Sequence, residues 1–172
     1  MVGQIASSKD VNDIHSSIKL GVDYFAVNNV ETREDILEIK EGLLSVKGRF
    51  IKVLAKIMNR KAISNFDEIL EAADGIIIAR GYLGLELRQQ DVAYVQKYLI
   101  YKCNIAGKPG VLQTQILESM MTRLIPTRAE VSDLSNAVSN GIDCCILSGE
   151  TSQGPFYKEV TETMSRICYE AE

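Results

Sequence analysis

The sequence predicts an α/β fold built around a parallel β-sheet. Five short apolar runs, rich in β-branched or aliphatic residues, lack the polar–apolar alternation of half-exposed strands and so are typical of strands covered on both faces. These runs cover 23–29, 50–57, 75–80, 110–115 and 143–148. Amphipathic stretches separate them, with about 25 to 35 residues from one run to the next, which is the spacing of βαβ units. We therefore expect the five strands to lie parallel and adjacent in chain order.

Residues with helix-capping chemistry mark the expected helix boundaries. The stretch 32–35, which begins with Thr32, opens one helix, and the stretch 64–67, which begins with Ser64, opens a shorter one. Thr127 with Glu130 has the spacing of a capping box. Two further stretches have helical periodicity, 91–106 and 159–171. Glycines stand where helices should give way to strands, at Gly21, Gly107 and Gly141.

A parallel sheet either stays open or closes into an eight-stranded barrel, and composition does not choose between these forms. No GxGxxG motif follows the first run, which weakens the dinucleotide-binding version. Polar residues stand at the carboxyl end of every run, where a barrel builds its active site. They are Asn28, Asn29, Lys56, Arg80, Gly81, Thr114, Gln115, Ser148, Gly149 and Glu150. Five strands are too few to close a standard barrel.

Composition indicates a globular protein with one domain over 1–172. The 172 residues are 46% hydrophobic and 24% charged, with a net charge of −4. The absence of basic runs disfavours nucleic acid and anionic membranes as partners. No apolar segment approaches the roughly 18 residues of a membrane span, and the amino terminus does not resemble a signal peptide. We expect a cytoplasmic protein.

The chain has four cysteines, Cys103, Cys144, Cys145 and Cys168, and one histidine, His15. No CxxC pair is present, which disfavours a zinc site. Cys144 and Cys145 are adjacent in an apolar run and should point to opposite faces of a strand. We expect buried, reduced thiols.

Several motifs, all in register and in one order, carry a family resemblance from about residue 21 onward. They occupy 51–57, 66–81, 103–109, 114–120, 126–130, 132–138 and 147–151. Together they resemble the catalytic barrel of pyruvate kinase. The resemblance implies a partial TIM-type (β/α) barrel with five parallel strands, corresponding to strands four to eight. Strands one to three, the lid domain and the C-terminal regulatory domain are then expected to be absent, together with the potassium ligands that the first strands carry.

The resemblance also implies roles for particular residues in phosphoryl transfer from phosphoenolpyruvate to ADP. Lys56 matches the catalytic lysine. A rim lysine with its stem along apolar neighbours is the alternative, but we favour a site position because Lys56 lies inside an otherwise apolar run within a matched motif. Thr114 matches the threonine near the reacting carbon, and it could also be a helix N-cap. Ala79, Arg80 and Gly81 match the turn whose backbone approaches the substrate carboxylate. Glycine there permits close approach of a ligand, or simply serves the turn.

The site departs from the family pattern where the family holds magnesium. Met58 stands where the resemblance implies a glutamate, and Tyr82 where it implies an aspartate. A thioether and a neutral phenol are poor ligands for this hard cation, so magnesium and potassium binding by this chain is doubtful. Gln113 replaces a small residue, and Asn28 and Asn29 replace a Ser-Phe pair. Departures thus concentrate at the rim, whereas the capping and packing motifs persist.

Three functions remain open, and the sequence does not decide whether the chain is an enzyme. The first is an enzyme-derived chain that is catalytically impaired or inactive. The second is an interaction protein that docks onto a pyruvate kinase subunit or onto a copy of itself. The third is a working fragment completed by another chain, against which Met58 and Tyr82 argue. Unpaired edges at 23–29 and 143–148 would favour self-association.

Overall fold

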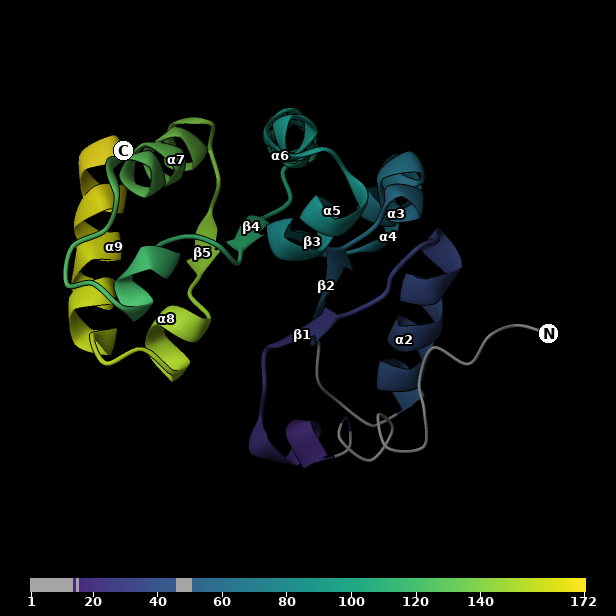
Figure 1. Cartoon of the computed structure of the whole chain (residues 1–172). Helices are drawn as coiled ribbons and strands as arrows, with labels where there is room; N and C mark the ends of the chain where they lie inside the picture. The colour runs from purple at the N-terminus through teal and green to yellow at the C-terminus, as the bar shows by residue number, and fades with distance from the viewer. Residues whose placement is uncertain (1–13, 15, 46–50) are drawn as a thin grey trace. The chain divides into compact units, whose positions relative to one another are not determined.

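The computed structural model describes residues 14, 16–45 and 51–172 (Figure 1). Two residues named above, His15 and the first residue of the run 50–57, lie outside the described residues, as does the amino-terminal stretch compared with a signal peptide. The chain divides into two compact units, 1–77 and 78–172. The prediction of a single domain over 1–172 stays a prediction.

Five strands form one sheet in the order β1-β2-β3-β4-β5. Their bounds are Tyr24–Val27 for β1, Lys52–Ile57 for β2, Gly75–Ala79 for β3, Gly110–Gln113 for β4 and Cys144–Ile146 for β5. β1 runs parallel to β2, with Tyr24 opposite Lys52. β4 runs parallel to β5, with Val111 opposite Cys144. The predicted fold class, a partial TIM-type (β/α) barrel with five parallel strands, is confirmed, and each strand lies within its predicted run.

The first unit also contains helices α2, Arg33–Ser45, α3, Arg60–Ser64, and α4, Phe66–Ala72. Thr32 begins α2 as predicted: the Asp35 carboxylate accepts the Thr32 N–H at 2.8 Å, and the Thr32 hydroxyl accepts the Asp35 N–H at 3.4 Å. The start of a shorter helix expected at 64–67 is confirmed by α4, which begins at Phe66, although Ser64 itself is not its N-cap. Ser64 is the last residue of α3, and Asn65 is the N-cap of α4. The Asn65 amide does not cap that helix, because it donates instead to the Glu31 carbonyl at 2.9 Å.

The second unit contains α5, Arg80–Glu86, α6, Gln89–Ala106, the 3-10 helix η1, Glu118–Met121, α7, Arg128–Ser139, α8, Gly149–Ser152, and α9, Tyr157–Ala171. The predicted capping box is confirmed: the Thr127 hydroxyl accepts the Glu130 N–H, and the Glu130 carboxylate accepts the Thr127 N–H at 2.8 Å. One apolar cluster joins η1, α7 and α9. Its buried members are Ile116, Leu117, Met120, Leu134 and Val160.

Two aspartates, Asp74 and Asp143, each pair with the beginning of the preceding strand through both their backbone N–H and their carboxylate. Asp74 donates its N–H to the Val53 carbonyl at 2.8 Å, and its carboxylate accepts the Val53 N–H at 2.9 Å. Asp143 repeats this with Gly110, at 3.0 and 2.8 Å. Each carboxylate therefore stands in for the backbone acceptor that is missing where a strand begins.

The three predicted helix-ending glycines all have positive φ. The values are 82° for Gly21, 62° for Gly107 and 87° for Gly141. Among residues with a Cβ this conformation is uncommon, which explains the glycines at these positions. Within the part of the chain that the structure describes, no helix is long and apolar enough to cross a membrane.

Candidate functional site

The turn that follows β4 has an unusual backbone. Thr114 and Gln115 have φ values of 71° and 54°, so two successive residues with a Cβ occupy the left-handed region. Each such residue costs on the order of 1–3 kcal/mol and persists only where its surroundings hold it. Strain of this kind gathers at functional sites, and sequence alone did not reveal it here.

The Arg80 guanidinium holds this turn. It donates to the Thr114 carbonyl from Nε at 3.3 Å and from Nη2 at 3.1 Å, and Nη2 also donates to the Gln115 carbonyl at 2.6 Å. Its Nη1 donates to the Gln96 amide oxygen at 3.3 Å and to the Asp133 carboxylate. Arg80 is 6% exposed and Gln96 5% exposed, so this charge lies in the interior, and it is paired with the partly exposed Asp133 carboxylate.

The Thr114 hydroxyl is engaged on both sides. It accepts the backbone N–H of Gly81 at 2.9 Å and donates to the Gln113 carbonyl at 2.6 Å. The alternative interpretation of Thr114 as a helix N-cap is wrong, because the next helical element, η1, begins at Glu118 with Leu117 as its N-cap. The structure thus brings Arg80, Gly81 and Thr114 together, as three of the predicted site residues, with the buried Ala79 as the N-cap of α5.

A pocket of about 340 Å³ opens beside this turn. It is lined by Gly81, Thr114, Gln115, Glu118, Met121, Ser148, Gly149, Glu150 and Gln153. Its polar rim therefore draws on the segments that follow β3, β4 and β5, as expected for the carboxyl ends of parallel strands. The Glu150 carboxylate is buried and accepts the Ser148 N–H at 2.7 Å, which gives it a role in shaping the loop into α8.

Lys56 and Met58 belong to the first unit. Lys56 lies in β2, half-buried between the buried Ala55 and Ile57. Burial lowers the pKa of the Lys56 ammonium below its ordinary value. Met58 follows β2 and is half-buried, and Asn59 caps α3 by accepting the Ala62 N–H at 2.8 Å. The assignment of Lys56 to catalysis stays a prediction.

The residues at the two expected metal positions do not fit magnesium. Tyr82 lies on α5 with 47% of its surface exposed, and Met58 offers only a thioether. Among the described residues, no group of three or more histidine, cysteine, aspartate or glutamate side chains could hold a metal ion. Asp91 is a carboxylate close to Tyr82 in the sequence, but both of its oxygens accept hydrogen bonds from Arg88, at 2.7 and 3.1 Å.

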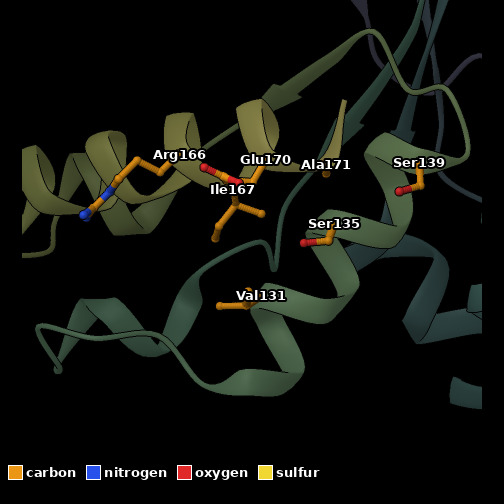
Figure 2. Close-up of a pocket in the computed structure, with 7 residues that line it drawn as sticks. All are labelled: Val131, Ser135, Ser139, Arg166, Ile167, Glu170 and Ala171. Carbon is orange, nitrogen blue, oxygen red and sulfur yellow. The ribbon is translucent and has the colours of Figure 1, made fainter.

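A second hollow, of about 520 Å³, lies between α7 and α9 (Figure 2). Its lining residues are Val131, Ser135, Ser139, Arg166, Ile167, Glu170 and Ala171. Ile167 points into the gap between the helices, whereas Arg166 extends away from it. Short hydroxyls and aliphatic groups dominate this lining, and they offer no arrangement suited to group transfer.

Two residues that bind Arg80 at this turn escaped the sequence analysis, Gln96 and Asp133. They lie 16 and 53 positions from Arg80, on α6 and α7, and they hold its guanidinium. Asp133 falls within one of the resembling motifs, but nothing local marked it as a partner of Arg80. All four cysteines are free thiols. The prediction that they are buried is confirmed for Cys103 and wrong for Cys144, which is exposed, whereas Cys145 and Cys168 are half-buried.

Comparison with known proteins bears on what this site is. The family model for the pyruvate kinase barrel domain matches residues 4–161. The chain belongs to the pyruvate kinase family. It is 47% identical over 169 residues to a pyruvate kinase of Eimeria tenella and 45% identical over 166 residues to one of Dictyostelium discoideum, covering 98% and 96% of this chain. It also resembles the crystal structure of a pyruvate kinase from Cryptosporidium parvum, with a TM-score of 0.94 and 38% identity over 99% of this chain.

The chain spans about a third of the length of these pyruvate kinases: 32% of each of the two curated relatives and 36% of the crystallised one. Pyruvate kinases use magnesium and potassium, act on phosphoenolpyruvate and ADP, and form oligomers. The Arg80–Thr114 turn therefore lies in the segment of this chain that matches the pyruvate kinase barrel domain. The roles of its residues, and the departure from the family pattern at residues 58 and 82, stay predictions.

Proposed function

We propose that this chain is a pyruvate kinase barrel that performs no effective phosphoryl transfer by itself, although it retains part of the site. The observation that carries the proposal is the chemistry of Met58 and Tyr82, neither of which supplies a carboxylate oxygen. Thr114, Gly81 and Lys56 remain, so the losses fall on the metal positions. The proposed cellular setting is the cytoplasm.

The physical argument rests on charge. Transfer of a phosphoryl group spreads negative charge over its oxygens, and enzymes neutralise that charge with cations held in place beforehand. Magnesium is bound through one or two carboxylates plus substrate oxygens and water. With both protein carboxylates replaced, a lysine ammonium would have to supply the positive charge that the family obtains from a lysine and a metal together.

Binding of Mn²⁺, followed by electron paramagnetic resonance, tests this proposal directly. We expect no site-specific binding by the wild-type chain, and a gain of binding in the variant Tyr82→Asp. Leu85→Asp is the matched control, because it adds a carboxylate to an exposed position of the same helix as Tyr82. Magnesium-dependent pyruvate formation from phosphoenolpyruvate and ADP that copurifies with the wild-type chain at constant specific activity would overturn the proposal.

A second candidate function, docking onto another protein, is favoured by one face of α6. Tyr94, Tyr98, Tyr101 and Ile105 are 76%, 47%, 60% and 67% exposed. Their spacing of four, three and four residues places them in one stripe along the helix. The opposite side of α6 is buried through Leu99, Ile100 and Cys103, so the stripe is not needed for packing within the unit.

Exposed aromatic side chains in a stripe of this kind are typical of the surfaces that become buried in helix–helix interfaces. The Lys102 ammonium lies 5.6 Å from the centre of the Tyr98 ring, which adds a cation beside the stripe. Together with β1 and β5, the two ends of the strand order, the stripe supports docking onto a second copy of this chain or onto a pyruvate kinase subunit. The homo-oligomer is the partner we favour, because pyruvate kinases form oligomers.

Light scattering over a concentration series tests this candidate. We expect the wild-type chain to associate with rising concentration and the variant Tyr94→Ser/Tyr101→Ser to associate more weakly. Tyr157→Ser/Tyr169→Ser is the matched control, since it removes two equally exposed tyrosines from α9. A wild-type chain that stays monomeric at high micromolar concentration and does not bind an added pyruvate kinase would exclude docking.

A further inference from the structure

The side chain of Arg80 has no donor left for a ligand. Its five N–H groups are directed to four acceptors within the second unit: the carbonyls of Thr114 and Gln115, the amide oxygen of Gln96 and the carboxylate of Asp133. A guanidinium carries five donors in a planar fork, and an ammonium carries three without that plane. Any contact between Arg80 and a substrate would therefore come from its backbone.

The two carbonyls that Arg80 holds belong to two successive residues with left-handed φ, Thr114 and Gln115. A turn of this kind returns to an ordinary conformation unless its surroundings restrain it. Arg80 supplies three hydrogen bonds to these carbonyls, the shortest at 2.6 Å. Gln96 and Asp133 in turn hold the guanidinium from α6 and α7, and so set the position of the fork.

The direction of the Thr114 side chain follows from the backbone of this turn. With φ at 71°, the Thr114 hydroxyl comes within 2.9 Å of the Gly81 nitrogen, at the edge of the 340 Å³ pocket. We propose that Arg80 is a positioning residue: through its planar fork it keeps Thr114 and Gln115 left-handed and so aims the Thr114 hydroxyl at the Gly81 amide. This role does not depend on whether the chain turns over substrate, and it goes beyond the proposed function.

If the role of Arg80 were only structural, its replacement would have a different effect on amide exchange. If Arg80 only joined helices through its ion pair with Asp133, its replacement would loosen the whole second unit evenly. If it positions Thr114, the loss concentrates at the Gly81 amide, whose acceptor is the Thr114 hydroxyl. Amide hydrogen exchange followed by NMR separates the two cases residue by residue.

The experiment compares Arg80→Lys with Arg88→Lys in the full 172-residue chain. Arg88 is the matched control because it makes a forked pair with Asp91 on the surface, away from the turn. We expect exchange at Gly81 to accelerate at least about tenfold in Arg80→Lys, whereas the amides of Leu112 and Leu134 change by less than about threefold. Thr114→Val, which removes the hydroxyl, should cause the same loss of protection at the Gly81 amide. Thr114→Ser, which keeps the hydroxyl, should retain that protection.

Asp133→Asn and Gln96→Leu change the two side chains that accept hydrogen bonds from Nη1 of Arg80. If Arg80→Lys does not fold, a selective loss at Gly81 in either of these variants supports the proposal. An even acceleration across the second unit, or failure of all three variants to fold, would establish a structural role and overturn it. Unchanged protection at Gly81 in a folded Arg80→Lys chain, or in Thr114→Val, would also overturn it.

Discussion

The backbone nitrogen of Gly81 lies 2.9 Å from the hydroxyl oxygen of Thr114, and this contact joins the start of α5 to the turn after β4. A Cβ added at Gly81 would lie 3.1 Å from the same oxygen, which is closer than side chains normally approach. A side chain at this position would therefore press against the hydroxyl that faces it, whatever ligand the pocket accepts.

Replacing Gly81 with alanine should therefore displace the Thr114 hydroxyl. We expect Gly81→Ala to lower the free energy of unfolding by about 1–3 kcal/mol, because the hydrogen bond weakens and the turn must shift. Gly84→Ala is the control, since no atom lies within 4 Å of the corresponding Cβ on the same helix. That variant should be neutral or stabilising by about 0.5–1 kcal/mol. Urea unfolding measures both, and equal effects would contradict the explanation.

Acid should weaken the chain through Asp74 and Glu130. Burial alone would raise the pKa of Asp74, but the Val53 N–H, the Lys40 ammonium at 3.0 Å and Lys52 hold it below its ordinary value of 3.8. Burial likewise opposes the hydrogen bonds from Ser119 and Thr127 that hold the pKa of Glu130 below 4.5.

Both carboxylates therefore have folded-state pKa values below their unfolded values. Their contribution to stability is complete above the unfolded pKa and is lost as the pH falls through the folded pKa. We expect the free energy of unfolding to decline as the pH drops below about 4.5, and the decline to be shallower in Asp74→Asn and Glu130→Gln. Urea titrations at a series of pH values measure this slope, and parallel slopes in the variants would contradict the assignment.

Thiol chemistry should distinguish the four cysteines. Burial raises the pKa of Cys103 to about 12 and that of Cys145 to about 12, and it also raises the pKa of Cys168. Because the thiolate is the nucleophile, a rise from 9.0 to about 12 lowers its population roughly a thousandfold. We expect iodoacetamide to modify the exposed Cys144 first and all four residues only after unfolding. Mass spectrometry of Cys144→Ser should then show no fast phase; rapid modification of Cys103 would contradict the burial.

Two lysines of the first unit should titrate on opposite sides of the ordinary value of 10.5. Burial lowers the pKa of Lys56, whereas a 2.8 Å hydrogen bond from Lys61 to the Glu31 carboxylate raises the pKa of Lys61. Dimethylation of the lysines with 13C followed by NMR titration reports each midpoint. We expect Lys56 below Lys61, with the difference reduced in Glu31→Gln. The reverse order would mean that Lys56 is not desolvated.

Most of the secondary structure could be anticipated because its signals are local. The apolar runs of β3 and β4 are short and lack the polar face that an amphipathic helix would show. The Thr127–Glu130 capping box is complete within four positions. The helix start at 64–67 could be anticipated for the same reason. Its N-cap is Asn65 rather than Ser64, because α3 ends at Ser64, and the Asn65 side chain donates to the distant Glu31 carbonyl.

In the candidate site, too, the local features could be predicted from the sequence and the long-range contacts could not. The identities of residues 58 and 82, on which the proposed loss of oxygen ligands for magnesium rests, follow from the order of residues in short motifs. The left-handed backbone of Thr114 and Gln115 does not, because neither residue is a glycine and no short pattern requires that conformation. It is maintained by Arg80, 34 and 35 positions earlier, and Arg80 is held by Asp133, 53 positions later. Contacts at such separations arise only when helices and strands pack, since the side chains that meet share no local periodicity from which their pairing could be deduced.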